Sequence, residues 1–254
     1  MRRRALGGLL ATALVLAACQ SGEGAPSSTM TTPTVATQST TTTGTTAPTT
    51  TTTTRPPGPN EVVIGDDQEP PTLNPYAPGG DNWIVSRIGQ AIFAGLTEVD
   101  GATGAIIPDL AVELPTVANG GVVVGTDGAT RVTFRIRDEA VWENGTPVTG
   151  DDVAFTYEAL MAAAPGTLNL DRNPYEAITG VEAHGKTVTL TFAAPTLAFE
   201  TMFPVVLPRH QMAGTDLAAD WNTEPWLSAG PFTFESWDPG EQLVLVRNER
   251  YWKT

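Results

Sequence analysis

Cysteine, histidine and basic residues are all scarce in this chain of 254 residues. Its one cysteine, Cys19, excludes an internal disulfide, and the two histidines, His184 and His210, leave little for metal binding. Lysine and arginine together number 14 against 28 acidic residues, which disfavours nucleic acid and anionic lipid surfaces as partners. We expect no cofactor, no bound metal and no membrane-spanning helix, because no window is long and apolar enough for one.

The N-terminus has the features of an export signal. Arg2–Arg4 form a basic start, and Ala5–Leu16 is an apolar stretch of about a dozen residues, shorter than the roughly twenty that a spanning helix needs. The Leu-Ala-Ala-Cys run that ends at Cys19 resembles the lipobox of bacterial lipoproteins, which are cut before an acylated cysteine. We therefore predict a signal peptide over residues 1–18 and a lipid anchor on Cys19, outside the cytoplasm at the outer face of the cell membrane. The alternative is a small buried cysteine in an ordinary signal peptide.

Residues 19–60 differ in composition from the sequence that follows. Ser27–Thr54 is mostly threonine with almost no charge, and it lacks the large apolar side chains whose burial offsets the entropy of ordering a chain. This composition predicts a disordered Thr/Pro-rich tether that carries a folded body away from the membrane. A mucin-like adhesive role is the alternative to a plain spacer.

Folded structure is expected from residue 61 onward. Glu61–Gly65 has the composition of a buried strand that a glycine stops. After a proline-rich loop, apolar residues between Ile84 and Leu96 recur at helical spacing. They predict a helix from about Asp81 to Ala94, with Asp81 or Asn82 as its cap.

The middle of the chain alternates between strand and helix patterns. Residues 121–125 and 130–137 are predicted strands, and in the second strand Val132, Phe134 and Ile136 alternate with arginines. The apolar set should therefore face the core, which leaves the arginines as solvated surface or, alternatively, as ligand contacts. Residues 187–192 and 242–246 alternate in the same way.

A second helix is predicted to begin at the sequence Thr149-Gly150-Asp151-Asp152. Threonine can cap a helix start, and the two aspartates suit its positive end. Apolar residues between Val153 and Ala164 would supply the buried face. A catalytic pair of carboxylates at Asp151 and Asp152 is the alternative.

Five stretches of the chain carry a resemblance to a known family. In chain order they are Ala91–Asp100, Val132–Leu160, Pro208-Arg209-His210, Ser228-Ala229-Gly230-Pro231-Phe232 and Arg247-Asn248-Glu249-Arg250-Tyr251-Trp252. Together they resemble the signatures of family 5 extracellular solute-binding proteins, the oligopeptide- and dipeptide-binding class, from about Glu61 to Lys253. Two positions depart from the family pattern: Glu139-Ala140 follows Asp138 where a glycine is usual, and Ala229 replaces the first glycine of a turn.

The resemblance implies a mixed α/β fold. Residues 61–94 and 191–254 would build a lobe like that of type II periplasmic binding proteins, and residues 95–190 would pack on it as an inserted α+β subdomain. Members of this class usually have two lobes that close over the ligand. Because this chain ends just after Tyr251-Trp252, where the family's chain crosses into its second lobe, we expect that lobe to be missing and ligand binding to be weak.

By the same resemblance, the loop after the first strand lines the ligand cleft. The residues expected to contact ligand are Leu73, Asn74, Asp81, Asn82 and Trp83. Trp83 would stack on a ligand side chain, and nearby backbone groups would pair with an extended peptide. The alternative is that Trp83 anchors its helix to the core and Asp81 caps it.

The function that this resemblance implies is capture of peptides or similar small solutes for an ABC importer. The expected partners are the solute and the permease complex, with the membrane reached only through the lipid anchor and the chain a monomer. No enzyme is expected, because the sequence holds no Gly-x-Ser-x-Gly elbow, no His-Glu-x-x-His and no catalytic cysteine. The alternatives are a non-transport surface or sensory module and an inactive fragment.

Overall fold

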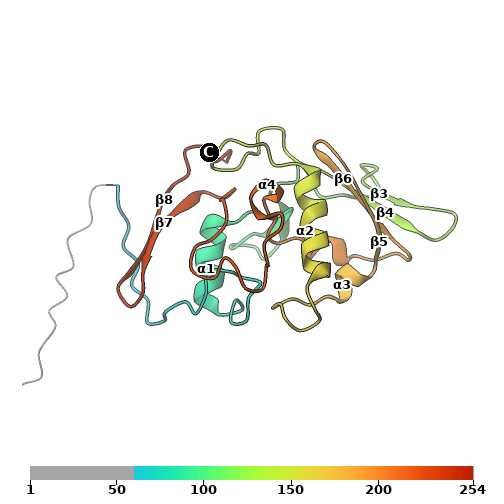
Figure 1. Ribbon diagram of the computed structural model, residues 1–254. Helices are drawn as coiled ribbons and strands as arrows, with labels where there is room; N and C mark the ends of the chain where they lie inside the picture. Colours follow the sequence, from blue (N-terminus) through green and yellow to red (C-terminus); the bar gives the residue numbers. More distant parts are fainter. Residues whose placement is uncertain (1–59, 254) are drawn as a thin grey trace, which may run out of the picture. The chain divides into compact units, whose positions relative to one another are not determined.

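A four-stranded antiparallel sheet and a helix packed against two of its strands dominate the middle of the chain (Figure 1). The strand order is β3-β4-β6-β5, with the bounds β3 Val122–Val124, β4 Thr130–Arg135, β5 Ile178–His184 and β6 Thr187–Phe192. The helix is α2, Gly150–Ala162, which contacts β5 and β6. The fold is a computed structural model that describes residues 60–253. The predicted signal peptide, Cys19 and the tether up to residue 59 lie outside the described residues.

Alternation along β4 decides which face of the sheet is buried. Val132 and Phe134 are fully buried, whereas Arg131 and Arg135 are exposed. On the exposed face the hydroxyl groups of Thr133 and Thr189 share a hydrogen bond of 3.0 Å across the strands. The predicted strand is therefore confirmed up to Arg135, with Arg131 and Arg135 exposed, whereas Arg137 lies beyond its end and donates to the Asp109 carbonyl at 2.8 Å.

The helix α1, Trp83–Ile92, confirms the first predicted helix within two residues at each end. Asn82 is its cap, because its side-chain oxygen accepts a hydrogen bond of 3.1 Å from the Ile84 N–H. Beyond α1 the chain runs beside residues 203–206, and the Leu96 N–H donates to the Phe203 carbonyl at 3.0 Å. A Cβ on Gly95 would lie 2.5 Å from the Pro204 carbonyl oxygen, so this close approach requires glycine.

The predicted strand at Glu61–Gly65 is wrong. These residues form no strand, and Val62, Val63 and Ile64 are 84%, 55% and 69% exposed. An apolar run becomes a strand only where a neighbouring strand supplies hydrogen bonds and cover. None of the described strands pairs with this segment, which explains the outcome.

Two pairs of strands stand apart from the four-stranded sheet. One pair is β1 and β2, Thr97–Val99 and Ile106–Pro108. The other is the ribbon formed by β7 and β8, Phe232–Asp238 and Gln242–Arg247, which among the strands of residues 60–253 pair only with each other. The remaining elements are short helices that the sequence patterns did not predict, and they are α3 Asn173–Glu176, η1 Ala198–Thr201 and α4 Arg209–Met212.

One connected cluster of buried residues forms the core. Trp142 and Trp226 belong to it and are each 1% exposed. The division into a first lobe and an inserted subdomain stays a prediction, and its boundary between residues 190 and 191 lies within β6. Across residues 60–253 no helix has the length and apolar character to cross a membrane.

Candidate functional site

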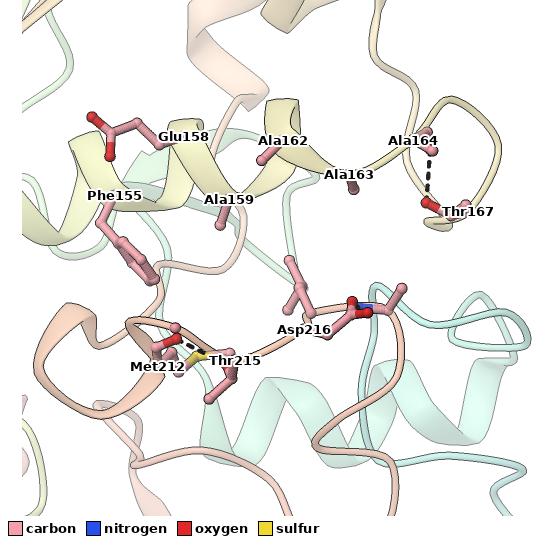
Figure 2. A pocket seen from close by; sticks show the side chains of 13 residues that line it. Phe155, Glu158, Ala159, Ala162, Ala163, Ala164, Thr167, Met212, Thr215 and Asp216 are labelled. Carbon is pink, nitrogen blue, oxygen red and sulfur yellow. Dashed lines mark hydrogen bonds between the residues drawn. The ribbon is translucent and has the colours of Figure 1, made fainter.

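An open hollow of about 590 Å³ lies between α2 and the chain segment that follows α4 (Figure 2). One wall is the C-terminal half of α2 and the loop after it, and the other is the segment from Met212 to Ala218. Small side chains leave the space unfilled, whereas Phe155 and Met212 narrow one end of it. The lining residues are Phe155, Glu158, Ala159, Ala162, Ala163, Ala164, Thr167, Met212, Gly214, Thr215, Asp216, Leu217 and Ala218.

The wall formed by α2 is held in place by Asp152. This buried carboxylate accepts hydrogen bonds from the Thr149 N–H at 2.8 Å and from the Arg209 N–H at 3.0 Å. One oxygen thus caps α2 while the other fastens the start of α4. Asp152 is a structural residue, and its exposed neighbour Asp151 does not share its bonds, so the alternative of a catalytic pair has no support.

A threonine in α2 makes a second link between the two walls. The Thr156 hydroxyl donates to the Asp152 carbonyl at 2.7 Å and accepts from the Leu207 N–H at 2.9 Å. The group is fully buried, so both bonds are shielded from water. The helix and the chain entering α4 are therefore joined at two successive turns of α2.

The opposite wall is braced by the loop that the sequence predicted to line a ligand cleft. Asn74 is fully buried, and its amide donates to the Leu217 carbonyl at 2.7 Å and to the Asp220 carbonyl at 3.2 Å. The neighbouring Leu73 N–H donates to the Asn222 carbonyl at 2.7 Å. The predicted loop therefore supports the hollow from behind.

The five residues predicted to contact ligand fall into two groups. Leu73 and Asn74 are buried against other parts of the protein. Asp81 is exposed, Asn82 caps α1, and Trp83 is 43% exposed at the start of that helix. None of the five lines the hollow, and ligand contact by each of them stays a prediction.

Trp83 has a charged neighbour at the surface. The Arg87 guanidinium lies 4.9 Å from the centre of the Trp83 ring and pairs with Asp66 at 2.9 Å. This cation–π contact occupies one face of the indole in a partly exposed setting. Because Arg87 belongs to the same helix and Trp83 is 43% exposed, this contact does not anchor α1 to the core, and the cap of α1 is Asn82 in place of Asp81; stacking of Trp83 on a ligand stays a prediction.

The residues of the hollow were missed because alanine gives a weak signal. Of the four alanines that line it, only Ala164 belonged to the predicted buried face of the helix, and Ala159, Ala162 and Ala163 were given no role. The only hint is their size, because a cluster of alanines at a helix end cannot fill the space beside it.

A charged cluster lies elsewhere, around the end of the described chain. The Lys253 ammonium pairs with Asp109 at 2.6 Å and with Glu98 at 2.7 Å. Burial raises the pKa of Asp109 despite this ammonium. Burial also opposes the charge of Lys253, but hydrogen bonds from its ammonium to Asp109 and Glu98 outweigh that effect and raise its pKa. The cluster ties residue 253 to the β1–β2 region.

The part of the chain that the structure describes contains no group of histidine, cysteine and acidic residues able to hold a metal ion.

Comparison with known proteins supplies the class. The family model described as "Bacterial extracellular solute-binding proteins, family 5 Middle" matches residues 105–254. This match covers more than half of the chain, so the chain belongs to that family of extracellular solute-binding proteins, and the resemblance seen in its motifs is confirmed. A solute-binding family is not a family of enzymes, which agrees with the expected absence of catalysis.

Individual relatives show how much of a family member this chain represents. Protein XP55 of Streptomyces lividans is 32% identical over 195 residues, which are 75% of this chain and 32% of that protein. The probable D,D-dipeptide-binding periplasmic protein DdpA of Escherichia coli is 28% identical, over 75% of this chain and 36% of that protein. The chain thus spans about a third of the length of these curated relatives.

A solved structure agrees with the mixed α/β fold. The periplasmic EDTA-binding protein EppA matches with a TM-score of 0.62 and 25% identity, over 74% of this chain and 35% of that chain. The match covers about a third of the EppA chain, so it supports the mixed α/β class of fold over the described residues.

Proposed function

We propose that this chain is the substrate-binding lipoprotein of an ABC importer. Lipidated Cys19 would anchor it to the outer face of the cell membrane, where it would capture peptides or similar small solutes and deliver them to a permease. The observation that carries the proposal is the hollow beside α2, in a chain that belongs to a solute-binding family.

The dimensions and composition of the hollow suit a small solute. Its volume of about 590 Å³ falls within the range of about 300–1,000 Å³ that is usual for small-molecule sites. Its lining is mainly apolar, with a few polar groups to orient a ligand. The walls are also fixed in advance by Asp152, Thr156 and Asn74, so little order has to be gained when a solute enters.

Peptides are one of the classes of solute that the names of the relatives include. The name of DdpA refers to a D,D-dipeptide, and that of EppA refers to EDTA, a small molecule bearing several carboxylates. A short peptide shares with both a compact size and more than one charged group. We take a tripeptide as the first probe, because its volume is compatible with the hollow.

The experiment is a nuclear magnetic resonance titration of the 254-residue chain with Ala-Ala-Ala. Because the hollow is open to solvent on one side, the dissociation constant should be weaker than about 1 µM but measurable below about 10 mM. Ala162→Phe, which fills the hollow from the exposed face of α2, should weaken binding at least about tenfold. Ala162→Ser keeps the volume and serves as the matched control.

Two results would contradict the proposal. The first is the absence of any saturable change in the spectrum up to about 10 mM peptide. The second is binding that Ala162→Phe and Ala162→Ser alter equally, because a site elsewhere would not distinguish filling the hollow from leaving it open.

A further inference from the structure

The side chains that line the hollow are divided into an apolar floor and a polar rim. Met212 and Leu217 are buried, at 2% and 6% exposure, and Phe155 and Ala159 are half-buried; these four residues form the floor. Every lining side chain that carries a polar group is exposed, and together they form the rim: Glu158, Thr167, Thr215 and Asp216. Figure 2 shows the Glu158 carboxylate turned away from the Met212–Ala218 wall. The charged groups therefore lie at the exposed rim, and none belongs to the floor.

The hydroxyl groups of the rim already have partners within the protein. The Thr215 hydroxyl donates to the Met212 carbonyl at 2.8 Å and accepts from the Trp221 indole N–H at 3.0 Å. The Thr167 hydroxyl donates to the Ala164 carbonyl at 2.7 Å. A polar group of a solute would have to displace one of these bonds, so the two hydroxyl groups brace the walls and offer little to a polar side chain.

Backbone carbonyl groups of the lining are engaged as well. The Leu217 carbonyl accepts from the Asn74 amide at 2.7 Å, and the Ala163 carbonyl accepts from the Arg172 guanidinium at 2.6 Å. A polar side chain that entered the hollow would lose its hydrogen bonds to water and find few replacements, which is costly. An apolar side chain gives up no such bonds, and its burial removes apolar surface from water. The floor therefore discriminates between side chains by their polarity.

From this arrangement we propose that the floor of the hollow takes one apolar side chain of a peptide, while the peptide backbone stays at the rim. Methionine suits the floor, because its flexible thioether adapts to irregular gaps and makes favourable contacts with an aromatic ring such as that of Phe155. The rim is exposed, so the polar backbone of the peptide keeps its contacts with water. This inference rests on the proposed function, because it names the class of solute taken by the same site.

The test compares the tripeptides Ala-Met-Ala and Ala-Gln-Ala. Methionine and glutamine have similar length and neither is charged, so the pair isolates the polarity of the side chain. We expect Ala-Met-Ala to bind on the order of fivefold more tightly than Ala-Gln-Ala, because only the methionine gains free energy when it leaves water for a partly open apolar floor. The readout is the same titration of the 254-residue chain.

A matched pair of leucine variants assigns the preference to the floor. Ala159→Leu fills the floor from α2 and should reduce the difference between the two peptides to within about twofold. Ala154→Leu adds the same volume at a half-buried position of α2 that does not line the hollow, so the difference should persist. The spectrum of each variant without peptide shows whether its fold is retained, and the comparison of the two peptides on the wild type stands without either variant.

The outcomes separate this inference from the proposed function. Equal binding of the two peptides, or a preference for Ala-Gln-Ala, overturns selection by polarity while solute binding stands. A preference for Ala-Met-Ala that Ala159→Leu leaves intact also overturns it, because the apolar contact would lie elsewhere. If neither peptide binds, the proposed function and this inference fall together.

Discussion

The sheet region and the ribbon region of this protein have similar apolar strand patterns but differ in how far their apolar residues are buried. The sheet region comprises the strands β3 to β6 and the helix α2, and its apolar residues Val132, Phe134 and Leu190 are fully buried. The ribbon region comprises β7, β8 and residues 61–65, where Val62, Val63, Phe232 and Val246 remain exposed. Both regions have apolar residues at strand-like spacing. The difference lies in whether a neighbouring element covers them.

This contrast shows that apolar pattern and burial are separate properties. In the sheet region the central strands β4 and β6 each have two strand partners, and α2 packs against β5 and β6, so the inward-facing apolar residues of the central strands are buried. In the ribbon region β7 and β8 have no third strand among the described residues, and α1 packs against β7 alone of the two. Three or more strands, or a helix over two, are the usual minimum for an independently stable sheet.

The largest expected effect comes from a matched pair of phenylalanines. Phe134→Ala, in the sheet region, removes a fully buried ring and should lower the free energy of unfolding by about 3–5 kcal/mol. Phe232→Ala, in the ribbon region, removes a ring that is 41% exposed and should cost less than about 1.5 kcal/mol. Urea unfolding of both variants checks this, and equal losses would remove the distinction between the two regions.

A smaller effect is expected at the start of α2. Asp152→Ala removes the cap of that helix and leaves the Arg209 N–H without its acceptor, at a cost of about 2 kcal/mol. Asp151→Ala, one residue earlier and exposed, should cost less than about 1 kcal/mol. Thermal unfolding of the two variants makes the comparison. A larger loss for Asp151 would mean that the helix dipole, and not the bond to Arg209, dominates here.

The smallest effect is a pair of opposite pH dependences. The pKa of Lys253 is raised by its bonds to Asp109 and Glu98, so its stabilising contribution is full below its ordinary value of 10.5 and is lost as pH rises through the raised pKa. Burial lowers the pKa of Lys186, in the sheet region, so the folded protein gains stability as pH rises through that lowered pKa toward 10.5.

Two methionine variants read out these dependences. The stability difference between wild type and Lys253→Met should shrink as pH rises above 10.5, whereas the difference for Lys186→Met should move in favour of wild type as pH rises toward 10.5. Thermal melts across this range give both curves. Curves of the same sign would show that the two lysines do not differ in the way their surroundings imply.

The sequence correctly predicted the strands and helices that are marked by local sequence patterns. The strand around Val132, the helix from Trp83 and the capped start of α2 were all foreseen, because alternation, helical spacing and capping residues are local signals. The structure of Val62–Ile64 was predicted wrongly, because a strand there would need a neighbouring strand, and local sequence does not reveal whether one is present.

The candidate site was predictable only in part. The motif resemblance led to the family and to the loop around Asn74, which the structure places behind the hollow. The hollow itself depends on how α2 meets the Met212–Ala218 segment, a contact fixed by Asp152 bonding to a backbone N–H 57 positions away. Alanine and glycine at its walls carry no chemical signature, so no reading of residue types alone could have found it.

The most direct test of the central claim is the location of a bound peptide. Intermolecular nuclear Overhauser effects should connect the methyl groups of Ala-Met-Ala with Phe155, Met212 and Leu217, on both walls of the hollow. Contacts with the Trp83 indole instead, or with no residue of the hollow, would contradict the account.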